Sequence, residues 1–159
     1  MKISLVDTFS SPGPRIVARI VNQDEVPQDL GPVVTEGARA SRFTGKAGQL
    51  FDGFVEREGA IVRIALVGVG KRDGEDRTGA IERAGAALTG KYLCSGEDRV
   101  GVELSGSGLS ADEAAAFLLG MRLRAWRHDT YRTKLKDEMK RTLAAAEVTG
   151  APDGTARAW

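Results

Sequence analysis

The 159-residue chain contains few of the side chains from which proteins build disulfides and metal centres. Cys94 is its one cysteine and His128 its one histidine. A single cysteine excludes an internal disulfide and fits a reducing compartment, so we expect a cytoplasmic location. Zinc sites gather three or four ligands, and here nearly all would have to be carboxylates, which are scattered along the chain. The sequence therefore predicts no metal site.

Long apolar runs and a strong net charge are missing as well. No segment approaches the roughly 20 apolar residues of a membrane span, and no apolar signal-peptide region follows Met1 and Lys2. We therefore expect neither export nor a membrane partner. The net charge of +1 favours neither general nucleic-acid binding nor an enzyme for acidic substrates. With 42% apolar and 28% charged residues, the composition is that of one soluble globular domain.

Predicted strands alternate with predicted helices along the chain. Short apolar or β-branched runs predict strands at 2–6, 15–22, 61–69, 99–106 and 140–148. A glycine-containing turn that runs into a further strand is predicted at 43–54. Helical spacing predicts helices at 33–41, at 76–93 and after Ser110. Ser110 and Glu113 match a capping box, so the third helix is the clearest. The alternation indicates an α/β sandwich with an at least partly parallel sheet.

The apolar run that ends in Gly-Val-Gly-Lys, residues 68–71, invites comparison with nucleotide-binding turns. A P-loop needs an earlier glycine and a following Ser or Thr, but Ala65 and Arg72 stand at those positions. The dinucleotide fingerprint fails too, because Asp73 takes the place of its third glycine and would repel a pyrophosphate. We therefore favour a tight joining turn over a phosphate site.

The remaining isolated candidates favour ordinary structural roles. His128 lies beside Asp129 near a predicted helix C-terminus, where the helix dipole favours a surface cation. Cys94 has no second histidine that could activate it. Ser107 lies between two glycines but matches only a part of the nucleophile-elbow pattern, so we expect a turn there.

A basic segment at 122–141 is more informative, because Trp126 and Tyr131 lie among its cations. Cations interleaved with aromatic residues can contact phosphates. A surface that meets another domain or subunit is favoured, since the rest of the chain is net acidic and offers no wider basic field. The candidate interface or nucleic-acid surface consists of Arg122, Arg124, Arg127, Arg132, Lys134 and Lys136.

Four segments, in this order, resemble the N-terminal domain of the leucyl (cytosol) aminopeptidases: 42–54, 63–74, 82–93 and 118–138. The resemblance covers nearly the whole chain. Its most specific part is Tyr131-Arg132-Thr133-Lys134, which matches a Tyr-(Arg/Lys)-Thr-Lys stretch of the family. His128 departs from the family pattern, which has phenylalanine between the flanking arginine and aspartate.

This resemblance implies a macro-domain-like three-layer α/β/α sandwich with a mixed sheet over residues 1–150. Residues 151–159 would then begin a helix linking it to a C-terminal catalytic domain. In the family, that second domain holds two divalent cations (zinc, manganese or magnesium) and releases N-terminal amino acids from peptides. Its ligands would lie beyond Trp159, so the resemblance assigns no catalytic, metal or cofactor-binding residue to this chain. The chain alone is predicted to be inactive.

The resemblance also implies partners: the C-terminal catalytic domain of the same parent chain, and further copies in a hexamer. The domain would organise that oligomer and shape access to the active sites. Two binding functions remain as alternatives, namely ADP-ribose at the 68–74 turn and nucleic acid at 122–141. Asp73 opposes the first and the near-neutral net charge opposes the second.

Overall fold

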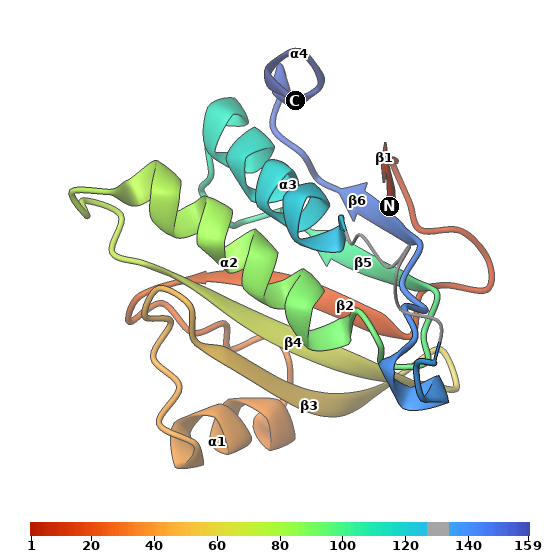
Figure 1. The fold of residues 1–159 in the computed structure, drawn as a ribbon. Helices are drawn as coiled ribbons and strands as arrows, with labels where there is room; N and C mark the ends of the chain where they lie inside the picture. Colours follow the sequence, from red (N-terminus) through yellow and green to blue (C-terminus); the bar gives the residue numbers. More distant parts are fainter. Residues whose placement is uncertain (127–133) are drawn as a thin grey trace.

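The computed structural model describes residues 1–126 and 134–159, and its centre is a six-stranded sheet (Figure 1). The strands follow the order β1-β6-β5-β2-β4-β3 across the sheet. Their bounds are β1 Lys2–Leu5, β2 Ile16–Asn22, β3 Leu50–Arg57, β4 Ala60–Gly70, β5 Arg99–Glu103 and β6 Ala145–Thr149. The helices are α1 Pro32–Ala40, α2 Arg77–Tyr92, α3 Ala111–Ala125 and α4 Thr155–Ala158, with a 3-10 turn at Asp137–Met139.

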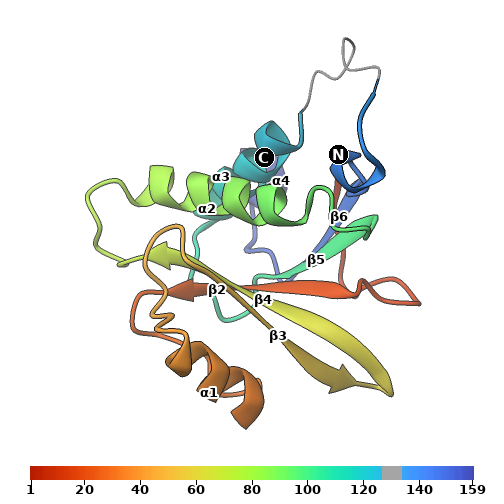
Figure 2. The same cartoon turned by 60° about the horizontal axis from the view of Figure 1, so that its bottom comes forward.

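The sheet is mixed, as the family resemblance implied. β1, β6, β5, β2 and β4 pair in parallel, whereas β3 pairs antiparallel with β4 through a tight hairpin. Helices α2 and α3 lie on one face and α1 on the opposite face, which gives three layers (Figure 2). Parallel strands need crossover connections, and α2 supplies the one from β4 to β5.

The larger core lies between the sheet and the α2–α3 layer. Leu88 of α2 and Phe117 and Met121 of α3 are fully buried there, against strand residues such as Val67 and Val102. Burying a side chain of this size contributes roughly 1.5–3 kcal/mol, so this layer dominates the stability of the domain. A smaller core joins α1 to the other face of the sheet.

Close contact between α2 and α3 depends on glycine. A β-carbon at Gly85 would overlap the Phe117 carbonyl oxygen, and one at Gly120 would overlap the Glu82 carbonyl oxygen. Both positions therefore lack a side chain because backbone of the neighbouring helix occupies the space. Ser110 accepts a hydrogen bond from the Glu113 amide at 3.2 Å, which confirms the predicted capping box at the start of α3.

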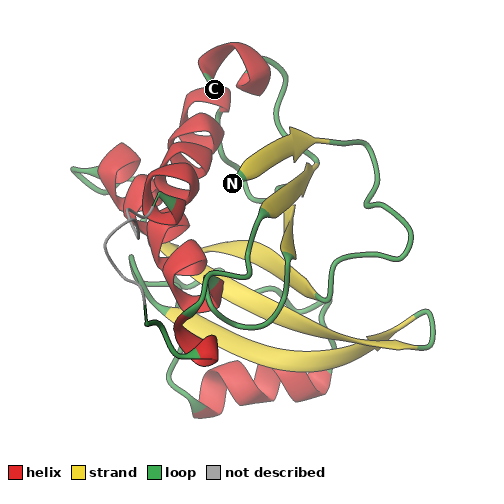
Figure 3. Cartoon of the chain, turned by 45° about the vertical axis from the view of Figure 1, so that its right-hand side comes forward, coloured by secondary structure: helices red, strands yellow, loops and turns green. Residues whose placement is uncertain are grey.

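Helix α1 covers only part of its face of the sheet, and the segment between β1 and β2 covers another part of the same face. The Ser10 amide and hydroxyl donate to the Glu147 carboxylate of β6 at 2.8 and 2.6 Å. Phe9 lies against Gly101 of β5, where a β-carbon would collide with its ring. These contacts fasten the segment across β5 and β6. Figure 3 shows it on the same side of the molecule as the β3–β4 hairpin turn.

Most predicted elements agree with the structure to within a few residues, but two strand bounds are wrong. The strand predicted at 140–148 begins only at Ala145, because the amides of Thr142 and Leu143 donate to the Leu93 carbonyl and not to a strand. The strand predicted at 99–106 ends at Glu103, since a turn with two glycines follows it. Within the described ranges, no helix has the length and apolar character needed to cross a membrane.

Candidate functional site

The glycine-rich end of β4 uses its backbone amides inside the protein. The Gly68 amide donates to the Gln49 carbonyl at 2.8 Å, and the Gly70 amide donates to the Gly45 carbonyl at 2.9 Å. The backbone of Lys46 lies directly against Gly68, where a β-carbon would overlap the Lys46 carbonyl oxygen. A phosphate site needs amides that point at the ligand. The geometry is therefore that of a joining turn.

A second group of amides nearby is filled by Gln49. Its side-chain oxygen accepts hydrogen bonds from the amides of Thr44, Gly45 and Lys46, each at 3.1 Å. Successive amides that point into one concavity form the kind of nest that binds anions. Here the uncharged amide oxygen of the chain itself takes that place, and it fixes the 44–49 loop against the end of β4.

Arg77 occupies the space in front of β4, where ligands of open α/β sheets usually bind. Its guanidinium donates to the carbonyls of residues 69–71 at 3.3 to 3.4 Å and to the Glu113 carboxylate at 3.4 Å. It also donates to the Asn22 side chain, which in turn donates to the Ser107 carbonyl at 2.9 Å. With an Arg77 side chain only 11% exposed, this end of the sheet is closed by internal hydrogen bonds.

Gln49 and Arg77 were not among the site residues predicted from the sequence. For Arg77 a signal existed, because a cation in the first turn of a helix opposes the helix dipole and must be compensated. Its partners come from three separate segments, so the sequence alone does not bring them together. For Gln49 the only signal was its place directly after a turn with two glycines.

Arg72 and Asp73 follow the Gly-Lys turn and lie at the protein surface. Arg72 forms two hydrogen bonds to the Glu25 carboxylate, at 2.7 and 3.1 Å, and its guanidinium lies against Gly108. The hydrogen bond from Arg72 lowers the pKa of Glu25 from its ordinary value. Asp73 is exposed beside this pair. Arg72 is thus already matched by a carboxylate.

Two grooves lie beside the part of the sheet that α1 does not cover. One, of about 790 Å³, lies at the ends of β5 and β6 and contains the carboxylates of Asp7, Asp29 and Glu103 around Arg19. Arg19 pairs with Asp29 at 3.3 Å and with Glu103 at 3.7 Å. The excess of acid disfavours phosphate-bearing ligands. The other, of about 1020 Å³, lies between the 9–15 segment and the β3–β4 hairpin.

A polar cluster joins the end of α2 to the edge strand β3. The Tyr92 hydroxyl donates to Asp52 at 3.3 Å, and Lys91 approaches the same carboxylate at 3.4 Å. The Arg63 guanidinium lies over the Phe54 and Tyr92 rings at 5.1 and 5.8 Å. Burial, and then the Asp52 charge, raise the pKa of Tyr92 far above its ordinary value. A phenol held in its neutral form beside a paired carboxylate fastens two elements and supplies no nucleophile.

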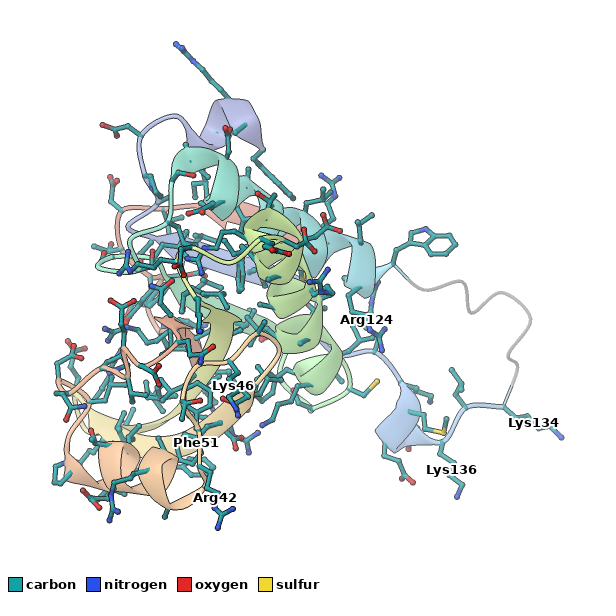
Figure 4. The ribbon with its side chains drawn as sticks, turned by 90° about the vertical axis from the view of Figure 1, so that its left-hand side faces the viewer. Arg42, Lys46, Phe51, Arg124, Lys134 and Lys136 are labelled. Atoms are coloured by element: carbon teal, nitrogen blue, oxygen red, sulfur yellow. The ribbon has the colours of Figure 1, made fainter. Side chains whose placement is uncertain are left out.

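The basic surface predicted from the sequence lies at the end of the helical layer. Arg122 and Arg124 are exposed on the last turn of α3, and Lys134 and Lys136 are exposed on the segment that leads to the 3-10 turn. Figure 4 shows Arg124 at this end of α3 and shows Lys134 and Lys136 on the segment before the 3-10 turn. The Arg122 guanidinium stacks over the Trp159 ring at 5.5 Å. The other two predicted members, Arg127 and Arg132, fall outside the described residues.

The residues that could ligate a metal do not gather. Within 1–126 and 134–159, no three His, Cys, Asp or Glu side chains lie close enough to hold an ion. The Cys94 thiol donates to the Met139 carbonyl at 3.4 Å. His128, Asp129 and Tyr131 lie outside the described residues. The described part of this chain therefore brings together no set of ligands for the two divalent cations that the family resemblance implies for the parent enzyme.

Comparison with known proteins gives one consistent family. The model for the N-terminal domain of the cytosol aminopeptidase family matches residues 18–135. A probable cytosol aminopeptidase of Bradyrhizobium sp. strain BTAi1 is 34% identical over 127 residues, which are 79% of this chain and 25% of that protein. One from Rhizobium etli strain CFN 42 is 37% identical over 131 residues, 77% of this chain and 26% of that protein. The chain thus spans about a quarter of the length of these relatives.

Solved structures show the same fold. A tomato leucine aminopeptidase variant superimposes with a TM-score of 0.71 at 20% identity, over 99% of this chain and 34% of that one. The bottromycin maturation enzyme BotP superimposes with a TM-score of 0.66 at 22% identity, over 92% of this chain and 29% of that one. At such low identity these likenesses establish the fold alone.

Proposed function

The chain belongs to the cytosol aminopeptidase family, and we propose that it acts there as a non-catalytic N-terminal domain. One observation carries the proposal: the whole match falls within about a quarter of each curated relative. The parent enzyme that this family implies releases N-terminal amino acids from peptides. Its chemistry then belongs to the larger part of the relatives that this chain does not match.

Residues 1–150 are proposed as the domain and 151–159 as the beginning of a helix toward the catalytic domain. Helix α4 supports this, because it starts after Gly154 and packs against α3, with Trp159 under Arg122. A chain leaving from this position would start beside the outer surface of α3. The catalytic domain is thus proposed as the first partner of this domain, tethered through α4.

The two divalent cations of the family are not assigned to this domain. Its described residues bring together no ligand set, and the turn at Gly68 and Gly70 is closed by hydrogen bonds within the chain. No step of peptide hydrolysis is therefore derived from these side chains. We therefore assign to the domain a role through its contacts, namely the organisation of a homo-oligomer and the shaping of access to the active sites.

The proposal is tested on a longer family chain with and without the region equivalent to residues 1–150. Removing that region is expected to lower the assembled mass in sedimentation. It is also expected to change the rate on long peptides relative to the rate on leucine anilide, because access affects large substrates most. An unchanged mass together with an unchanged ratio of rates would refute the assigned role.

A further inference from the structure

The side-chain oxygen of Gln49 accepts more hydrogen bonds than it can satisfy well. The amides of Thr44, Gly45 and Lys46 donate to this one oxygen at 3.1 Å each, and the Thr44 hydroxyl donates to it at 3.3 Å. An amide oxygen has two lone pairs. All four contacts are also longer than the roughly 2.9 Å of an ordinary amide hydrogen bond. Four donors thus share one uncharged acceptor, and a charged group with several oxygens would match them better.

The backbone of this loop has partners other than the Gln49 side chain. The Thr44 carbonyl accepts from the Asp24 amide at 2.7 Å, and the Gly45 carbonyl accepts from the Gly70 amide at 2.9 Å. These bonds hold the loop to the ends of β2 and β4. The donors therefore stay directed at one point when the Gln49 side chain, which is only partly buried, turns away.

The loop itself carries positive charge and no acid. No Asp or Glu occurs from residue 37 to residue 51, whereas Arg42 and Lys46 are both exposed. Neither forms an ion pair with another described residue. Figure 4 shows both on the same side of the molecule. Lys46 supplies its amide to the group of donors, so its ammonium group is the cation that belongs to this position.

Carboxylates of a neighbouring segment also come near. Asp24 is exposed, and it meets the loop through a backbone bond to a carbonyl, not to the donor amides. Glu25 is paired with Arg72 at 2.7 Å. At the adjacent turn the exposed Lys71 and Asp73 carry opposite charges. The converging donors, and not a wide field of positive charge, therefore define this site.

We propose that the amides of residues 44–46, with the Thr44 hydroxyl and the Lys46 ammonium, bind a phosphate group, and that Gln49 occupies the site until this ligand displaces it. Successive amides of this kind bind anions. A phosphate offers three oxygens and up to two negative charges, so the donors need not share one atom. Hydrogen bonds to a charged oxygen are shorter and roughly twice as strong. The inference goes beyond the contact role proposed above and does not depend on it.

The first test is an NMR titration of the isotope-labelled 159-residue chain with inorganic phosphate, at neutral pH and constant ionic strength. The wild type is expected to show saturable shifts of the Thr44, Gly45 and Lys46 amides. Gln49→Ala is expected to bind about tenfold more tightly, because the apparent affinity no longer includes the displacement of the glutamine. Gln28→Ala is the matched control, since Gln28 makes one local bond at the surface, and it should bind as the wild type does.

A lysine pair tests the contribution of charge. Lys46→Ala should weaken phosphate binding severalfold, since it removes a cation but no backbone donor. Lys136→Ala should leave the affinity unchanged, because this exposed lysine lies on the segment before the 3-10 turn. Circular dichroism checks that each variant is folded. Equal weakening by the two changes would reveal only general attraction to positive charge and would overturn the inference.

Gln49→Glu places a carboxylate among the donors without any added ligand. This variant is expected to be more stable than the wild type at neutral pH and to lose the phosphate response of the 44–46 amides. The donors should depress the folded pKa of the new carboxyl. Its stabilisation is then present above the unfolded pKa and is lost as the pH falls through the folded pKa. Lower stability than the wild type at neutral pH, measured by urea unfolding, would overturn the inference.

Further ligands identify the source of the phosphate group. Tighter binding of phenyl phosphate than of inorganic phosphate supports an ester of a larger molecule, and equal or weaker binding supports the free ion. Acetate should bind at least severalfold more weakly. Acetate that binds as tightly as phosphate overturns the choice of ligand.

The remaining outcomes also decide. Absence of binding in both the wild type and Gln49→Ala overturns the inference. Binding by Gln49→Ala alone overturns it too, because Gln49 would then be a permanent occupant. Shifts confined to the basic segment 122–141 count equally against it. None of these results affects the proposed contact role, which the longer family chain tests separately.

Discussion

Gly68 lies so close to the Lys46 carbonyl that the β-carbon of any other residue would overlap that oxygen. The contact joins the end of β4 to the loop that precedes β3, and it explains the glycine without any ligand. The same loop supplies the carbonyl of Gly45, to which the Gly70 amide donates. The Gly-Lys turn is therefore one half of a packed pair of loops.

The first prediction concerns this contact. Gly68→Ala should destabilise the domain by about 1–3 kcal/mol, because the added methyl group must push backbone apart. Gly13→Ala is the control, since a β-carbon there meets its nearest atom at an ordinary 3.7 Å. Urea unfolding measures both. Equal stability of Gly68→Ala and the wild type would show that the 44–49 loop is not packed as described.

The second prediction concerns the nest of amides at residues 44–46. Gln49→Ala should cost about 1–3 kcal/mol, because three backbone donors, two of them partly buried, lose their acceptor. Gln28→Ala should have a small effect, since Gln28 makes one local hydrogen bond at the surface. The loss in Gln49→Ala is expected to appear as faster hydrogen exchange at Thr44, Gly45 and Lys46. Unchanged exchange there would contradict the assignment of Gln49.

The third prediction concerns a buried hydroxyl. Thr89 is completely buried in α2, and its hydroxyl has no hydrogen-bond partner among the described residues. Thr89→Val keeps the shape and removes the unpaired group, so stability should stay the same or rise by up to about 1 kcal/mol.

Thr155→Val is the control for that change. Thr155 is also buried, but its hydroxyl donates to the Pro152 carbonyl at 2.6 Å. Its replacement should destabilise the domain by about 1 kcal/mol. A large loss in Thr89→Val would mean that the Thr89 hydroxyl is paired.

The fourth prediction concerns pH. Hydrogen bonds from the Ser10 hydroxyl and amide, helped by Arg99, lower the pKa of Glu147 from its ordinary value of 4.5. A carboxyl whose folded pKa is depressed contributes stability that is fully present above the unfolded value. That contribution is lost as the pH falls through the folded value. Ser10→Ala should therefore reduce stability at neutral pH and narrow the difference between neutral and acidic conditions.

The measurement is urea unfolding near neutral pH and at a pH below the folded value of Glu147, together with the NMR titration of the Glu147 carboxyl carbon. In Ser10→Ala that carbon should titrate at a higher pH than in the wild type. Ser41→Ala, at an exposed position whose side chain makes no hydrogen bond to the described residues, serves as the control. A Glu147 titration unaffected by Ser10→Ala would contradict the account of this contact.

Much of the fold followed from local patterns. The capping box at Ser110 and the apolar run of β4 were identifiable because their signals lie within a few residues of each other. The start of β6 was not, since residues 142–144 are β-prone in sequence but donate their amides to the distant carbonyls of Leu93 and Asp98. Strand limits are set by such long-range partners, which no local window contains.

The candidate surface was predictable only in part. The basic end of α3 was visible in the sequence as Arg122 and Arg124. The contact of Arg122 with Trp159 was not, because α4 meets α3 only in the folded chain. The closure of the Gly-Lys turn by Arg77 and Gln49 likewise depends on segments that are distant from one another in the sequence.

The central proposal is that this domain acts through its contacts and does not itself hydrolyse peptides. The most direct test is an assay of the purified 159-residue chain on leucine anilide, with and without added manganese or zinc. We expect no turnover above a matched preparation from cells that lack the gene. Metal-dependent turnover that co-purifies with the folded chain, and that is lost when the chain is unfolded in urea, would contradict the proposal.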